Sequence, residues 1–175
     1  MSTTDQSKFI ATLLPNGEPT DATASQFLDL YKMMVASSET LVGRRQGANT
    51  FFLSINGFLL TAIGLFISLS GQARLQAVGT LVLGITGALT AWVWRTLLIS
   101  FGQLNTGKFT VINEMEKRLV AGIYSAEWEA LEHAKNKKVY RTFTSREVMI
   151  PQVLGIIYIL VMLISVVVSL GWWHL

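Results

Sequence analysis

Three long stretches of this chain contain no Lys, Arg, Asp or Glu. Arg45 and Arg74 bracket 28 uncharged residues, Arg74 and Arg95 bracket 20, and 28 more follow Glu147. Each stretch reaches the roughly 20 residues that a helix needs to cross a bilayer. The pattern predicts an all-α membrane protein with three transmembrane helices. The expected spans are about 49–70, 75–98 and 151–173.

A polar tail and amphipathic segments make up the rest of the sequence. Residues 1–20 are mostly polar and contain Pro15, Gly17 and Pro19, which predicts a disordered N-terminal tail. After residue 20, apolar residues recur every three or four positions up to the first span, as in an amphipathic helix that continues into the membrane. A similar pattern predicts a helical cytoplasmic part over about 99–147. Residues 21–175 are therefore expected to form a single helical membrane domain.

Small residues recur regularly within the first two spans. In lipid, helices associate through close backbone approach, which small side chains allow. The pattern therefore predicts a helix-packing seam whose partners include other copies of the chain, in a homo-oligomeric ring. Its members are Ser54, Gly57, Thr61, Gly64 and Ser68 in the first span and Gly84 and Ala88 in the second.

The basic residues are distributed unevenly around these spans. Four precede the first span, nine lie within residues 95–147, and only Arg74 lies in the short turn between the first two spans. Cytoplasmic loops carry the excess of Lys and Arg. The N-terminus and the 95–147 loop are therefore expected in the cytoplasm and the C-terminus outside. No signal-peptide pattern precedes the first span, so that span is expected to act as the targeting signal.

The chain offers few groups suited to catalysis. It has no cysteine, which excludes thiol chemistry and thiolate metal ligands. The two histidines, His133 and His174, belong to no metal-binding, phosphate-binding or nucleophile motif. The sequence predicts a protein that is not an enzyme and that uses no cofactor, metal or nucleic acid. The formal net charge of +3 is small and reflects membrane orientation.

Polar residues at the membrane are the best candidates for function. Asn49 and Asn56 are seven residues apart and share one helix face. They either line a path for water or ions, or form hydrogen bonds between helices that fix the helix register. Arg44 and Arg45 precede the first span and Arg95 follows two tryptophans. These arginines either anchor the topology or attract anions and lipid headgroups at the inner mouth of a ring.

Three stretches resemble a known family. They are LYKMMVASSETLVGRRQGANTFFLSINGFLL, WRTLLISFGQLNTGKFTVINEMEKRL, and YSAEWEAL followed by SREVMIPQVLGIIY. They are similar to the RipA family of small octameric inner-membrane proteins of bacteria, over about residues 30–158. The resemblance implies a homo-oligomer, an octamer, in the bacterial inner (cytoplasmic) membrane, and it implies no catalytic residue. The positions that carry it are Arg44, Arg45, Gln46, Asn49, Asn56, Trp94, Arg95, Asn105, Lys108, Glu116 and Trp128.

Lys108 stands out among these positions. It falls within an apolar stripe, where a lysine is costly unless it is paired. Glu116 and Glu39 are the candidate partners, across helices or across subunits.

Two functions fit these features. The first is a ring whose central space is a pore or chamber for ions or small solutes, suggested by Asn49, Asn56 and the nearby arginines. The alternative is a non-conducting membrane scaffold that organises lipid or recruits a cytoplasmic protein partner. The expected partners are other copies of this chain, membrane lipid and, for the scaffold, that cytoplasmic protein.

Overall fold

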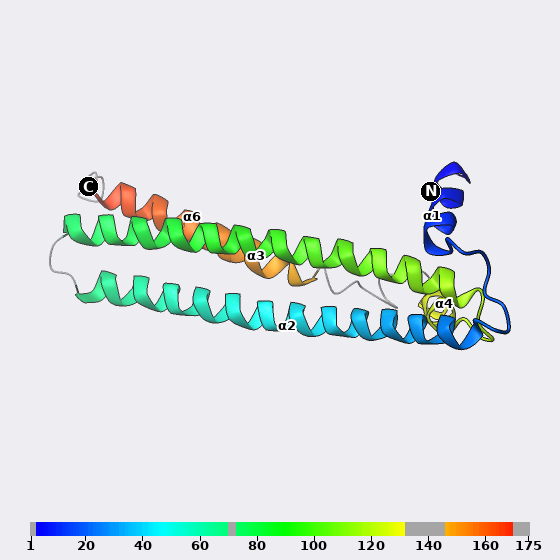
Figure 1. The fold of residues 1–175 in the computed structure, drawn as a ribbon. Helices are drawn as coiled ribbons and strands as arrows, with labels where there is room; N and C mark the ends of the chain where they lie inside the picture. Colours follow the sequence, from blue (N-terminus) through cyan, green and yellow to red (C-terminus); the bar gives the residue numbers. More distant parts are fainter. Residues whose placement is uncertain (1–2, 70–72, 132–145, 170–175) are drawn as a thin grey trace. The chain divides into compact units, whose positions relative to one another are not determined.

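The computed structural model describes residues 3–69, 73–131 and 146–169, and the regular structure within these ranges is helical (Figure 1). Three of the helices are long and apolar enough to cross a membrane. The predicted all-α membrane fold is therefore confirmed. The helices are α1 (Thr3–Leu13), α2 (Ala24–Leu69), α3 (Ala73–Glu116), α4 (Ile123–Ala130) and α6 (Met149–Ser169).

Helices α2 and α3 are unusually long, with 46 and 44 residues. Each joins a predicted span to an amphipathic segment without a break, because no proline occurs between residues 20 and 150. Helix α2 begins just after Thr23, whose carbonyl oxygen accepts a hydrogen bond from the Phe27 amide. The glycines of α3 weaken a helix by about 1 kcal/mol each, which is too little to interrupt one of this length.

The chain packs as two compact units, where the sequence analysis expected one helical domain after residue 20. The first unit comprises Met1–Leu41 and Leu104–Tyr140, and the second comprises Val42–Gln103 and Arg141–Leu175. Helices α2 and α3 contribute residues to both units. Each unit is described by itself below.

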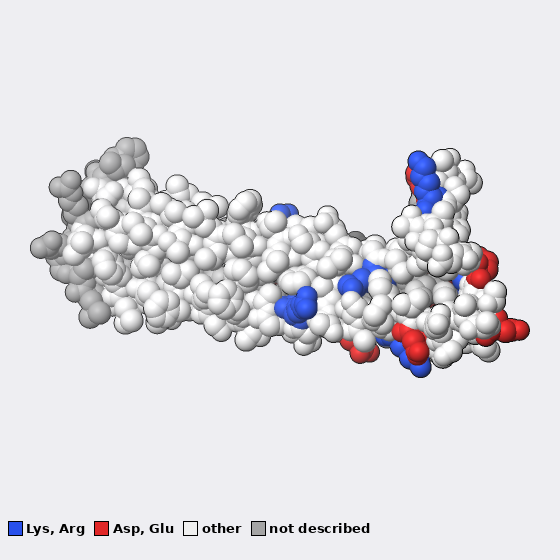
Figure 2. All heavy atoms as spheres, viewed as in Figure 1, with Lys and Arg blue, Asp and Glu red and all other residues white. Residues whose placement is uncertain are grey.

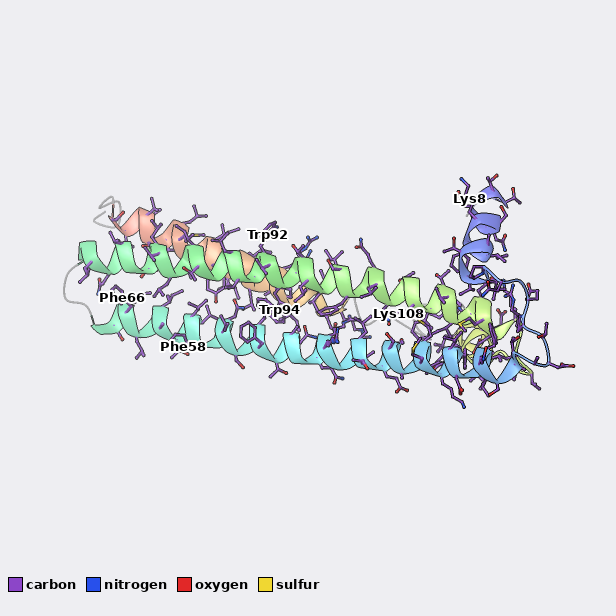
Figure 3. All side chains as sticks on the ribbon, viewed as in Figure 1. Lys8, Phe58, Phe66, Trp92, Trp94 and Lys108 are labelled. Carbon is purple, nitrogen blue, oxygen red and sulfur yellow. The ribbon has the colours of Figure 1, made fainter. Side chains whose placement is uncertain are left out.

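The second unit contains the predicted spans. Its core is centred on Leu59 and Ile63 of α2 and Tyr158 of α6, which are buried. Figure 3 shows Trp94 between α2 and α3, whereas Trp92 points away from α2. The outer surface of this unit is apolar, and the face drawn in Figure 2 has a wide area without Lys, Arg, Asp or Glu along α2 and α3. Such a surface fits contact with lipid.

The first unit contains a helix where a disordered tail was expected. Helix α1 occupies Thr3–Leu13, and its last turn brings Leu13 and Leu14 to a small apolar pocket that Phe27 and Met115 also line. The sequence analysis gave weight to the prolines and glycine of residues 15–19. It missed that Phe9, Ile10, Leu13 and Leu14 recur at helical spacing and so provide an apolar face that can pack.

Candidate functional site

Asn56 lies inside the second unit. Its side chain is only 1% exposed. The carboxamide nitrogen donates to the Phe52 carbonyl oxygen at 2.8 Å, and the carboxamide oxygen accepts a longer hydrogen bond from the Thr90 hydroxyl of α3. The Asn56 carbonyl oxygen also accepts from the Tyr158 hydroxyl at 3.2 Å. A single buried asparagine therefore links α2 to both α3 and α6.

Asn49 makes a second polar contact between α2 and α3. Its side-chain oxygen accepts a hydrogen bond from the Trp94 indole nitrogen at 2.9 Å. The Trp94 ring stacks on Phe52, with centroids 5.9 Å apart and planes 8° apart. A buried indole usually needs an acceptor, and Asn49 supplies it. Within one chain, both asparagine side chains form hydrogen bonds with residues of α3.

The glycines of α3 form the contact with α6. A Cβ atom on Gly84 would approach Met162 to 2.6 Å, and one on Gly87 would approach the Tyr158 ring to 2.2 Å. Ala88 packs against the core cluster nearby. The predicted α3 part of the packing seam is thus used within the chain. The sequence analysis missed Gly87, although the only tyrosine of an otherwise apolar span signals a close, hydrogen-bonded contact.

Of the three candidate arginines, Arg45 has the clearest role. Its guanidinium donates to the Glu147 carboxylate through Nε at 2.6 Å, and Nη2 also contacts that carboxylate. This ion pair joins α2 to the residues that precede α6. Arg44 is exposed and Arg95 is half-buried. The sequence analysis missed Glu147 as a partner, although Arg45 and Glu147 precede the first and third predicted spans, which are expected to begin on the same side of the membrane.

We expect a charge swap to reveal the Arg45 and Glu147 pair. Either Arg45→Glu or Glu147→Arg alone places two like charges at a poorly solvated contact and should lower stability by about 2–4 kcal/mol. The double variant Arg45→Glu/Glu147→Arg should recover most of that loss, measured by thermal unfolding in detergent. If the double variant is as unstable as the sum of the singles, the pair does not join these helices.

Lys108 takes a different partner from the two that were expected. In the first unit its ammonium group donates to the Ser37 hydroxyl of α2. Among the described residues, no ion pair joins Lys108 to Glu39 or Glu116. A pair across subunits stays a prediction, and an octamer of unchanged stability in Lys108→Met would exclude it.

Glu116 instead holds the start of α4. Its carboxylate accepts hydrogen bonds from the backbone amides of Tyr124 and Ser125, from the Ser125 hydroxyl and from the Tyr31 hydroxyl, at 2.9–3.0 Å. Burial by itself would raise the pKa of this carboxyl, but the hydrogen bonds together hold the pKa below its ordinary value. Glu116 therefore caps α4 from the end of α3 and stays ionised.

The seam predicted on α2 has a different environment from that on α3. A Cβ atom on Gly57 or Gly64 would meet nothing within 4 Å, and Ser54, Thr61 and Ser68 are exposed. The three- and four-residue spacing extends further toward the N-terminus than the sequence analysis recognised. The full small-residue seam in this unit consists of Gly43, Gly47, Thr50, Ser54, Gly57, Thr61, Gly64 and Ser68, and all eight are exposed.

The hydroxyl groups of this small-residue seam are largely satisfied by their own helix. Thr50 donates to the Gln46 carbonyl oxygen, Thr61 to that of Gly57, and Ser68 to that of Leu65. Asn56 and Ile63 project from the opposite face of α2, since each lies nine positions, about 180°, after a seam residue, Gly47 and Ser54 respectively. One side of α2 thus packs on its own chain, and the other presents the small-residue seam with large apolar side chains beside it.

The exposed faces of α3 and α6 are made of large side chains. These faces consist mainly of Val78, Val82, Ile85, Leu89 and Trp92 on α3 and of Ile156, Ile159, Leu160, Leu163 and Ile164 on α6. Large aliphatic side chains and interfacial tryptophan are typical of contact with lipid. Among the described helices of this unit, α2 is the one with a continuous strip of exposed glycine and hydroxyl residues, and large exposed side chains such as Phe58 and Leu53 flank this strip.

Two features lie outside the described residues. They are the two histidines, His133 and His174. Among the described residues, no group of three or more His, Cys, Asp or Glu side chains is placed to hold a metal ion.

One comparison with known proteins gave a match. The model of the octameric membrane protein family (8xMP) matches residues 28–173, which is most of the chain. No curated protein and no solved structure matches. The matched range includes α2, α3, α4 and α6.

Proposed function

Because this chain belongs to the octameric membrane protein family, we propose that eight copies form a ring whose central space is a pore or chamber for ions or small solutes. The hydroxyl residues of the small-residue seam of α2, Thr50, Ser54, Thr61 and Ser68, face that space. The observation that carries the proposal is the exposure of all eight seam residues on the side of α2 opposite its own chain. Asn49 and Asn56, which suggested a pore in the sequence, instead hold α2 against α3 behind the lining.

The chemistry of the helix faces supports this placement of α2. The large aliphatic faces of α3 and α6 suit lipid, so these helices take the outside of the ring. The small-residue seam carries no charge and has hydroxyl groups at Thr50, Ser54, Thr61 and Ser68. Such a lining presents oxygen atoms to water and leaves more room than large side chains would.

The size of an eight-membered ring also supports a central space. Packed helices lie about 8–10 Å apart and each is about 10 Å wide. Eight such helices in a closed circle leave a central opening roughly 10 Å wide, which glycine and serine side chains do not fill. In our proposal water and solutes occupy this space. The alternative is that lipid fills it.

The proposal includes an orientation. We place the N-terminus and residues 95–147 in the cytoplasm and the C-terminus outside the bacterial inner membrane, as the distribution of basic residues favours. The proposal also includes a specific relationship to the RipA family, which the sequence resemblance implies. The proposal assigns no catalytic step and no cofactor to the chain.

Two measurements test the proposed pore. The wild-type octamer, reconstituted in liposomes, is expected to pass ions or small dyes, and Thr61→Trp is expected to reduce the flux at least tenfold by placing eight indoles in the lumen. Leu163→Trp, on the exposed face of α6, is the matched control and should leave the flux unchanged. In parallel, Ser54→Cys in this cysteine-free chain should react with a membrane-impermeant thiol reagent, whereas Leu163→Cys should not.

The absence of flux together with an unreactive Ser54→Cys would overturn the pore. The ring would then enclose lipid or protein, and the scaffold function, with a search for a cytoplasmic partner, would replace it. A reactive Ser54→Cys without flux would indicate a closed chamber.

A further inference from the structure

In the octamer, each copy of the chain must contact its two neighbours through defined surfaces. All copies insert with the same orientation, so eight of them are related by rotation about one axis normal to the membrane. In such a ring each subunit uses two different faces, and a surface never meets its own equivalent. The small-residue seam therefore cannot pack against the same seam of the next chain.

Helix α2 carries two suitable faces, one beside the small-residue seam and one that includes its glycines Gly57 and Gly64. On one side lies a ridge of Phe51, Phe58 and Leu65, which are seven residues apart and exposed. Phe58 is 73% exposed, and Figure 3 shows it on α2 away from Trp94 and α3. Each ridge side chain is more than half exposed among the described residues, although the Phe51 ring meets the Phe52 ring edge-on.

On the other side lies a strip of the α2 surface that we name the groove, made of Leu53, Gly57, Leu60 and Gly64. Gly57 and Gly64 form its floor, because a Cβ atom at either position would meet nothing within 4 Å. Leu53, which is exposed, and Leu60, which is half-buried, form its wall. A phenylalanine of a second copy can pack beside these leucines and over the two glycines, in the manner of a knob entering a hole.

The angle between the two faces matches an eightfold ring. With about 100° per residue, the ridge and the centre of the groove point about 130° apart around α2. The two neighbours of each member of a regular octagon lie about 135° apart. Between the two directions lie Thr50, Ser54, Thr61 and Ser68, which then face the axis, while α3 and α6 of the same chain lie outward.

From these observations we infer that the ring closes through α2 alone, with the Phe51, Phe58 and Leu65 ridge of each chain seated in the Leu53, Gly57, Leu60 and Gly64 groove of a second copy. The inference rests on the proposed position of α2 at the axis. It does not require that the central space conducts.

Disulfide cross-linking tests this contact, since the chain has no cysteine of its own. Phe58→Cys combined in turn with Leu53→Cys, Gly57→Cys or Leu60→Cys should give, in at least one combination, a ladder of covalent oligomers up to the octamer after oxidation in membranes. Each single-cysteine variant should remain monomeric on a denaturing gel. The three combinations cover the shifts in height that a tilt of the helices would produce.

The alternatives give different gels. Dimers from Gly57→Cys alone would show seam-to-seam contact, and no cross-link in any combination would leave the ridge in lipid. Either result would overturn the inference. As a second measurement that needs no cysteine, Phe58→Ala should reduce the octamer population at least tenfold in native mass spectrometry, and Leu163→Ala should not. Cross-linking without flux would retain the contact and reject the pore, whereas flux without cross-linking would do the reverse.

Discussion

Gly87→Ala is expected to destabilise the protein by about 2–4 kcal/mol, although alanine favours a helix over glycine by about 1 kcal/mol. The cause is the contact between α3 and α6. The new methyl group would lie 2.2–2.5 Å from three carbon atoms of the Tyr158 ring. That ring is fully buried in the core, and its hydroxyl is bound to the Asn56 carbonyl oxygen, so it cannot move aside cheaply. The measurement is thermal or denaturant unfolding of the purified protein in detergent.

Two further variants test whether contact with the Tyr158 ring causes the loss of stability in Gly87→Ala. Gly155→Ala on α6 makes the same chemical change at a site with nothing within 4 Å, and it should be neutral or slightly stabilising. In a Tyr158→Leu background, Gly87→Ala should also become neutral or stabilising, because the ring that it strikes is gone. An equal loss from Gly87→Ala in both backgrounds would show that the contact is not the reason.

The general fold could be predicted because its causes are local in the sequence. Uncharged stretches of 20 or more residues and the absence of proline between residues 20 and 150 are enough to give three apolar helices, two of them long. Helix α1 was missed because two signals competed over residues 1–20. The proline and glycine residues at 15–19 favoured a disordered tail, whereas the apolar spacing at 9–14 indicated a helix.

The candidate site could be predicted only in part, because its residues depend on contacts between distant segments. Spacing placed Asn49 and Asn56 on one face of α2 but did not reveal that Trp94, Thr90 and Tyr158 complete their hydrogen bonds. The same limit applies to the two groups of small residues. Gly84 and Ser54 look alike in the sequence, yet Gly84 packs beneath Met162 whereas Ser54 is exposed.

The partner of a charged residue was the hardest feature to predict. Glu116 and Glu39 were the two candidate partners of Lys108, but within the chain Lys108 and Glu116 each find a partner on another element. Glu116 is the last residue of α3, and the amides at the start of α4 lie only eight and nine residues further along the chain. A carboxylate that caps a helix more than one turn away leaves no regular spacing in the sequence.

Glu116→Gln is expected to release α4 from the first unit. The carboxylate accepts four hydrogen bonds through two oxygens, and the amide nitrogen of glutamine would face donors at one of those positions. Losing charge-assisted hydrogen bonds and leaving buried donors unpaired should cost about 2–4 kcal/mol. Amide hydrogen exchange in α4 should then accelerate roughly 30- to 1,000-fold, since each 1.4 kcal/mol corresponds to about a factor of ten. Glu39→Gln, at an exposed position of α2, is the matched control and should leave the exchange unchanged.

The pH dependence of α4 release distinguishes a loss of the Glu116 hydrogen bonds from a general loss of packing. The pKa of Glu116 is lowered in the folded protein, so its contribution to stability is complete above the ordinary glutamate pKa of about 4.3 and is lost as the pH falls through the lowered folded value. The wild type should therefore hold α4 equally well from pH 7 to about pH 5 and release it progressively in stronger acid. In Glu116→Gln this acid-dependent step should disappear, because no proton is taken up at that position. An unchanged acid transition in the variant would assign the step to other carboxylates and would contradict the role of Glu116 as the cap of α4.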